Sequence, residues 1–375
     1  MREKDLNAVA RQVQERVARI LDSTRLYTDQ DFQEVIECCV VKEMEQTYLT
    51  LEEQQQVTDT VLNATRKFDF LQPYLEDESI SEIMINGVNH IFVEQNGSMR
   101  RVYVEGLTEE KLYEVIQNMV SKANRTVNES SPIVDIGLPD GSRANVVLNP
   151  LAVNGPCVTI RKFPQEPLTM EALVENGTMT QELGAFLKEI VQTKHNILVS
   201  GGTSSGKTTM LNVLSQCIPS TERIITIEDS VELQLRQAEN LVALEVRNKN
   251  HEGTGGISVR DLVKTAMRMR PDRIVVGEVR DGAALDMIQA LNTGHDGSMS
   301  TIHANSAEDA LLRLETMALS AEAIPLEAIR RQVATAIRIV IHMDRDANLH
   351  RTVRNVIEIQ GLEEGNYRIR ELYKR

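Results

Sequence analysis

The stretch SGGTSSGKTT, residues 200–209, fits two incompatible chemical motifs. Residues 202–206 match the G-x-S-x-G turn that presents the nucleophilic serine of a hydrolase, which here would be Ser204. Residues 201–208 match G-x-x-x-x-G-K-[ST], the loop that wraps the phosphates of a nucleotide. Both motifs lie on a turn between a strand and a helix, so the expected local structure does not separate them.

The phosphate interpretation uses every position of the stretch. Gly201 and Gly206 allow backbone N–H groups to close around an anion. Lys207 places a positive charge at the β- and γ-phosphates, and Thr208 offers a hydroxyl to Mg²⁺. The hydrolase interpretation gives no role to Lys207 or Thr208, so we predict ATP and Mg²⁺ as ligands. The residues expected to bind the nucleotide are Gly201, Gly202, Thr203, Ser204, Ser205, Gly206, Lys207, Thr208 and Thr209.

Carboxylates follow two other apolar runs of the chain. RIVVGEVR places Gly277 where a P-loop enzyme usually carries a metal-binding aspartate, and Glu278 directly after it. RIITIEDSVEL places Glu228 at the end of its run. We expect Glu278, helped by Glu228, to orient or deprotonate the attacking water. Thr208, Glu228 and Glu278 are the candidate Mg²⁺ ligands; which of them binds directly stays open, and ordinary solvated strand-end residues are the alternative.

A histidine and two arginines complete the candidate catalytic set. His303 ends the apolar run SMSTIHA, where it is expected to contact the γ-phosphate; a satisfied core histidine is the alternative. Phosphoryl transfer also needs positive charge from outside the loop. Arg143 and Arg161 precede the phosphate loop in the chain and would reach the nucleotide by domain closure, although either alone is typical of a surface arginine.

The elements that position these residues fall into four stretches. We expect a helical segment over residues 1–66, an α+β nucleotide-clamping domain over 67–163, a proline-containing linker over 164–178 and an ATPase domain over 179–375. In the last stretch apolar runs alternate with helical patterns. Such runs, unlike alternating ones, indicate strands buried on both faces of a parallel, doubly wound sheet.

Two local signals lie in the second stretch. Asn96-Gly97 between strand-like segments predicts a hairpin turn. Thr108 before an amphipathic pattern predicts the start of a helix.

Composition limits the class of protein. The 375 residues are 41% hydrophobic and 26% charged, with a net charge of −14 that repels nucleic acid overall. No apolar run reaches the ~18–20 residues of a membrane span, and the N-terminus does not resemble a signal peptide. We therefore expect a cytoplasmic protein with no nucleic-acid partner. The four cysteines form no C-x-x-C pair, which disfavours structural zinc.

Four motifs in order resemble the secretion-ATPase superfamily, the hexameric motors of type II secretion, type IV pili and type IV secretion. They are GGTSSGKTT (Walker A), IITIEDSVELQL (acidic box), RIVVGEVRDG (atypical Walker B) and GHDGSMSTIHANS (His box). LEDESISEIMINGVNHIFVEQNG and SSPIVDIGLPDGSRANVVLNP further resemble the CpaF/TadA-type branch, which powers tight-adherence (Flp-type) pili. The resemblance covers roughly residues 60–345, and VRDG differs from the VRGG common in that branch.

The resemblance carries its own expectations. It implies an α/β fold: a RecA-like P-loop ATPase domain preceded by an α+β (PAS-like) domain and a helical N-terminal segment. It also implies a homo-hexamer that works on an inner-membrane platform protein and lies peripherally at the inner face of the cytoplasmic membrane. In that family the missing aspartate is usual, and Glu278, Glu228, Arg143 and Arg161 match its catalytic positions. A type IV secretion ATPase, a nucleic-acid motor and a non-hydrolysing scaffold are the rival interpretations.

Overall fold

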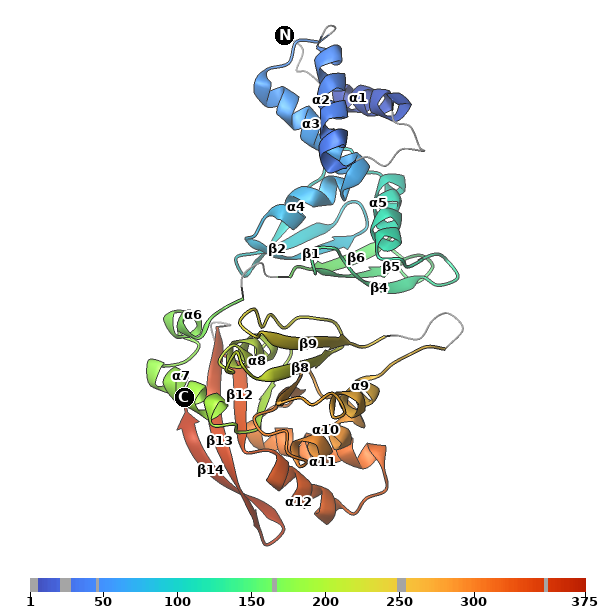
Figure 1. Cartoon of the computed structure of the whole chain (residues 1–375). Coiled ribbons are helices and arrows are strands. Elements are labelled where there is room, and N and C mark those ends of the chain that lie inside the picture. Colours follow the sequence, from blue (N-terminus) through green and yellow to red (C-terminus); the bar gives the residue numbers. More distant parts are fainter. Residues whose placement is uncertain (1–5, 21–27, 45–46, 164–166, 248–253, 347–349) are drawn as a thin grey trace. The chain divides into compact units, whose positions relative to one another are not determined.

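The computed structural model describes residues 6–20, 28–44, 47–163, 167–247, 254–346 and 350–375. The chain forms two compact units, Met1–Gln165 and Glu166–Arg375 (Figure 1). Residues 164–166 of the expected linker lie outside the described residues. The rest of that linker contains a short helix, α6 (Met170–Glu175), because the Thr169 side chain accepts the N–H of Ala172 and caps its start.

Three helices begin the first unit and share a core of their own. They are α1 (Leu6–Ile20), α2 (Asp29–Glu43) and α3 (Leu51–Arg66). Val13, Val17, Ile36 and Val61 are buried where the three helices meet. The apolar side chains of the predicted helical segment therefore pack within this helical group.

A six-stranded antiparallel sheet forms the rest of the first unit, in the order β3-β2-β1-β6-β5-β4. Its elements are η1 (Asp69–Leu71), α4 (Gln72–Glu76), β1 (Ile80–Asn86), β2 (Ile91–Gln95), β3 (Ser98–Val102), α5 (Glu109–Lys122), β4 (Ile133–Gly137), β5 (Arg143–Val147) and β6 (Cys157–Arg161). Asn96 and Gly97 join β2 to β3 with positive φ angles of 51° and 75°, as the predicted hairpin requires. Thr108 caps α5, also as predicted.

The alternation of side chains along these strands separates the two faces of the sheet. One face buries Ile83, Ile85, Val146 and Ile160 against α5. The opposite face carries polar side chains, including Arg143 and Arg161, because residues two apart along a strand point the same way.

The second unit is built on an eight-stranded sheet in the order β14-β13-β12-β7-β11-β10-β8-β9. Its strands are β7 (Ile197–Gly201), β8 (Arg223–Glu228), β9 (Asn240–Glu245), β10 (Arg273–Val276), β11 (Met299–His303), β12 (Ile339–Arg345), β13 (Arg351–Glu363) and β14 (Asn366–Lys374). The strands from β12 to β9 pair in parallel, and β13 and β14 extend the sheet with antiparallel pairing.

Helices cover both faces of this sheet (Figure 1). After α6, they are α7 (Gln181–Gln192), α8 (Lys207–Ser215), α9 (Val259–Ala266), α10 (Ala283–Leu291), α11 (Ala307–Ala321) and α12 (Leu326–Ala336). One apolar cluster joins helices α6, α7 and α8 to the sheet. A second cluster joins helices α9, α10, α11 and α12 to the sheet. Every residue of β7 and of β10 is buried, which explains why these strands read as continuous apolar runs.

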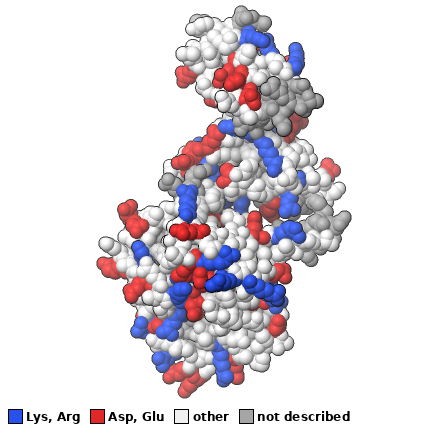
Figure 2. Space-filling view, in the orientation of Figure 1, with Lys and Arg blue, Asp and Glu red and all other residues white. Residues whose placement is uncertain are grey.

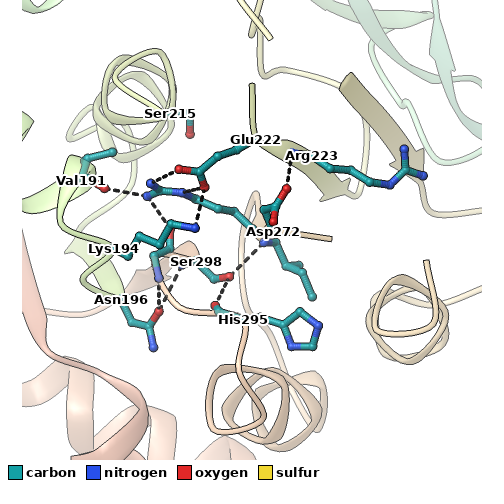
Figure 3. Close-up of polar contacts among 12 residues, drawn as sticks. Val191, Lys194, Asn196, Ser215, Glu222, Arg223, Asp272, His295 and Ser298 are labelled. Atoms are coloured by element: carbon teal, nitrogen blue, oxygen red, sulfur yellow. Dashed lines mark hydrogen bonds and ion pairs between the residues drawn. The ribbon is translucent and has the colours of Figure 1, made fainter. Parts of the chain in front are cut away.

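A buried ion pair lies at the amino end of β10 (Figure 3). The Arg273 side chain is 0% exposed and donates to both carboxylate oxygens of Glu222, at 2.8 and 3.1 Å. It also donates to the carbonyl oxygens of Val191 and Gly297, at 2.7 and 3.3 Å. Lys194 adds a second cation 3.3 Å from Glu222. This network joins α7, β10 and the turns before β8 and β11, at the sheet edge opposite the phosphate loop.

None of the helices in the described part of the chain combines the length and the apolar character that a membrane crossing requires. On the face shown in Figure 2, acidic and basic side chains of the second unit are interspersed.

Candidate active site

The predicted phosphate loop joins β7 to α8 at the carboxyl edge of the parallel sheet. Gly206 has a φ of +96° and directly precedes α8, a conformation that L side chains rarely adopt. A Cβ atom on Gly201 would lie 2.4 Å from the carbonyl oxygen of Met343 and 2.4 Å from Ser205 Oγ. Both glycines of the motif are therefore required by the backbone path. Thr208 and Thr209 lie half-buried in the first turn of α8.

Strand order brings His303 to this loop. β11 is the parallel neighbour of β7, and His303 aligns with Gly201. Lys207, 7% exposed, donates from Nζ to the Gly202 carbonyl oxygen at 2.7 Å and lies 3.3 Å from His303 Nδ1. Because an ammonium group only donates, His303 Nδ1 accepts and the ring proton is assigned to Nε2. Burial, followed by the charge of Lys207, lowers the pKa of His303 and favours this neutral form.

Glu278 lies two residues beyond the end of β10 and meets the other side of the His303 ring. His303 Nε2 is 3.4 Å from Glu278 Oε1. Arg280 donates to both Glu278 oxygens, at 2.8 and 3.1 Å, and also reaches Asp229 at 3.0 Å. Burial raises the pKa of Glu278, but the hydrogen bond and charge of Arg280, with His303 and Lys207, outweigh it and leave the pKa below its usual value. Glu278 is thus a carboxylate at neutral pH.

Glu228 ends β8, the neighbour of β10 on its far side, and is 3% exposed. Its Oε2 accepts the backbone N–H groups of Glu232 and Leu233, at 2.8 and 3.1 Å. A Cβ atom on Gly277 would lie 3.0 Å from Glu228 Cγ. Glycine therefore replaces the usual aspartate at 277 because the Glu228 side chain occupies the space beside it.

The hydrolase interpretation of Ser204 finds no support in this arrangement. Among the described residues, the histidine nearest the loop, His303, hydrogen-bonds Lys207 and lies 3.4 Å from Glu278, and no histidine bonds to the Ser204 hydroxyl. A serine nucleophile needs a base within hydrogen-bond reach.

Arg143 and Arg161 are neighbours in the first unit. They are directly paired across β5 and β6, and Glu82 of β1 lies opposite Arg161, with its Oε1 3.9 Å from the arginine Nε. Arg161 is exposed and Arg143 half-buried. The structure brings these two arginines together, and their action on the nucleotide stays a prediction.

Comparison with known proteins agrees with the geometry. The family sequence model of the type II/IV secretion system proteins matches residues 64–366, more than three-quarters of the chain. The chain belongs to this family. A putative conjugal transfer protein of Mycobacterium tuberculosis is 32% identical over 299 residues, covering 78% of this chain and 84% of that protein. The type IV secretion system protein PtlH homolog of Bordetella bronchiseptica is 34% identical over 301 residues, which cover 74% of this chain and 89% of that protein.

A solved structure shows the same fold. The ATPase DotB of Yersinia pseudotuberculosis aligns with a TM-score of 0.56 at 18% identity, covering 83% of this chain and 80% of that one. The predicted RecA-like α/β architecture is confirmed.

In this type II/IV secretion family member, three arginines that the motifs did not single out also contact residues of the candidate site. Arg280 pairs with Glu278, and Arg345 and Arg351 donate to the carbonyl oxygen of Ser204. In the sequence, only the position of Arg280, two residues after Glu278, could have indicated its contact with that carboxylate. Arg345 and Arg351 lie more than 140 residues from Ser204 in sequence, and only the pairing of β12 with β7 brings them to the loop.

The oxygen donors at this edge fit a Mg²⁺ ion. The Thr208 hydroxyl lies in the first turn of α8, and the Glu228 and Glu278 carboxylates follow neighbouring strands. Hard oxygen ligands of this kind suit Mg²⁺, which usually binds through one or two carboxylates and the substrate's phosphates. Within the described residues, no cluster of three or more His, Cys, Asp or Glu could hold a metal by itself. The Mg²⁺ expected here would therefore share its coordination with ATP.

Restoring the usual aspartate should damage this site. Gly277→Asp places a side chain against Glu228 Cγ and a second carboxylate in a half-buried position, so we expect phosphate release to fall about tenfold or more, with roughly 1–3 kcal/mol lost in unfolding free energy. Gly277→Ala, which adds only the Cβ atom, should have the smaller effect. Steady-state assays and denaturant unfolding measure both; an aspartate variant as active as wild type would contradict the packing argument.

Proposed function

We propose that this chain is the ATP-hydrolysing motor of a pilus-assembly or secretion system. The observation that carries the proposal is the chain of contacts Gly202–Lys207–His303–Glu278, which joins the phosphate loop to a half-buried carboxylate at the carboxyl edge of the sheet. Ligands of open α/β sheets bind at this edge. Membership of the type II/IV secretion family supports the assignment.

Each residue has a role that follows from its position. Lys207, now bonded to the Gly202 carbonyl, would turn to the β- and γ-phosphates, while loop N–H groups surround them. Glu278, held ionised, would orient the attacking water and accept its proton, supported by Glu228. His303 would donate its Nε2 proton either to Glu278 or to a γ-phosphate oxygen. A bound Mg²⁺ would neutralise charge that develops on the phosphate oxygens.

Arg143 and Arg161 would supply the remaining positive charge when the two units close on the nucleotide. Hydrolysis would then release this closure, a hinge-type motion that produces work. We expect a homo-hexamer acting on an inner-membrane platform protein, with the motor peripheral at the cytoplasmic face of the membrane and no nucleic-acid substrate.

The experiment that tests hydrolysis is phosphate release by the purified chain with and without Mg²⁺, with particle mass measured in the same samples. Lys207→Ala removes the charge that meets the phosphates, so we expect release to fall by roughly 100-fold or more. Lys188→Ala, an exposed lysine on α7, is the matched control and should keep wild-type turnover. Equal turnover in both variants, or turnover unaffected by EDTA, would overturn the proposed role of the loop.

What the motor drives has two candidate answers. The resemblance of its upstream segments to the CpaF/TadA-type branch favours assembly or retraction of tight-adherence pili. The names of the two relatives, a conjugal transfer protein and a type IV secretion protein, favour type IV secretion. Deleting the gene in its host separates the two functions. Loss of surface pili with intact conjugal or protein transfer supports the pilus function. Loss of conjugal or protein transfer with intact pili supports type IV secretion.

A further inference from the structure

The phosphate loop is held by a strand pair that is remote from it in sequence. Arg345 ends β12, Arg351 begins β13, and the two residues are direct partners in the antiparallel pairing. Each donates its Nε–H to the same acceptor, the carbonyl oxygen of Ser204, at 3.1 and 3.2 Å. Because β12 is also the parallel neighbour of β7, this end of the strand pair lies beside the loop.

The acceptor belongs to a residue with an unusual backbone. Ser204 has a φ of +58°, a left-handed conformation that is energetically unfavourable for a non-glycine residue. Such a conformation persists when surrounding contacts impose it. Two charge-assisted hydrogen bonds to one carbonyl oxygen are contacts of this kind, and they are roughly twice as strong as neutral ones.

Arg351 touches the loop at a second point. A Cβ atom on Gly206 would lie 3.3 Å from Arg351 Cδ, so the aliphatic stem of the arginine packs against the glycine that precedes Lys207. The contacts of Arg345 and Arg351 therefore bracket residues 204–206, the part of the loop whose N–H groups are expected to surround the phosphates.

We propose that Arg345 and Arg351 are positioning residues for nucleotide binding. They hold residues 204–206 in the phosphate-binding conformation before ATP arrives, and their two guanidinium groups add positive charge next to a polyanion. This inference rests on the proposed ATP function of the loop. Both side chains are exposed, so their charge is screened by salt and their contribution to overall stability is small.

The test measures nucleotide affinity directly, so that it does not depend on a partner that stimulates hydrolysis. Binding of a fluorescent ATP analogue is titrated for wild type, Arg345→Ala, Arg351→Ala and the double variant. We expect the double variant to bind about tenfold or more weakly, with KM for ATP raised equally and kcat within about twofold. The midpoint of thermal unfolding should change by no more than about 2 °C.

Two further variants separate position from charge. Arg345→Lys and Arg351→Lys keep the charge but lose the Nε–H donor, so they should recover affinity only in part. Hydrogen exchange of residues 202–206 without nucleotide should be faster in both the alanine and the lysine variants. Arg354→Ala, an exposed arginine on the same strand β13, is the matched control and should bind like wild type.

Each outcome is decisive. Wild-type affinity and unchanged exchange in the double variant, or an equal loss in Arg354→Ala, would overturn this inference and leave the ATP function intact. If the wild-type chain binds no ATP, the proposed function fails with it. If the double variant does not fold, the single lysine variants decide, because each retains the positive charge.

Discussion

Glu278→Gln is expected to lower ATP turnover by about 10²–10⁴-fold while nucleotide affinity stays within about threefold of wild type. Glutamine keeps the size of the side chain and can still accept from Arg280, but it cannot take a proton from water. Measurement combines steady-state phosphate release with titration of a fluorescent ATP analogue. The expected result is a variant that binds and retains ATP.

The matched control for this change is Glu239→Gln, which alters an exposed glutamate of the same unit and should leave turnover unchanged. Retention of more than a tenth of wild-type turnover in Glu278→Gln would show that Glu278 does not activate the water. Glu228, the buried carboxylate that ends the neighbouring strand β8, would then be the candidate.

The largest expected loss of stability follows from Arg273→Ala. The arginine is fully buried and its removal leaves Glu222 with Lys194 alone, and the carbonyl oxygens of Val191 and Gly297 lose a donor. Removing one partner of a buried pair costs about 3–5 kcal/mol. Denaturant unfolding of the intact chain, with a probe in the second unit, measures this cost.

A second variant separates the lost ion pair from the lost packing. Arg273→Met combined with Glu222→Leu replaces both charges by apolar groups of similar volume, and should recover most of the stability. A loss below about 1 kcal/mol in Arg273→Ala would mean that water replaces the guanidinium without strain, and that the network in Figure 3 does not hold β10 in place.

The parts of the site that could be predicted are those governed by a simple rule. Carboxyl ends of parallel strands meet at one edge, so apolar runs that lead to the phosphate loop, Glu228, Glu278 and His303 indicate residues near one another. The same rule does not give strand order. That β11 lies next to β7, and so sets His303 against Lys207 and Glu278, follows from the crossovers of the whole domain.

Residues outside the motifs depend on pairings between distant segments. Arg345 and Arg351 meet Ser204 only because β12 lies next to β7 and pairs with β13 on its other side. In the first unit, Arg143 and Arg161 are neighbours because β5 and β6 pair in that register. Local patterns reveal the strands, but a register between strands depends on the packing of both faces at once.

The contact between Gly277 and Glu228 has a consequence for comparing proteins of this kind. The two positions, on adjacent strands, share one volume that holds a single acidic side chain. A larger residue at either position therefore limits the size allowed at the other, and the two should change together during evolution. A search that scores each position independently would count Gly277 as a lost aspartate, whereas a search that scores the pair would also take account of the acidic group on the neighbouring strand.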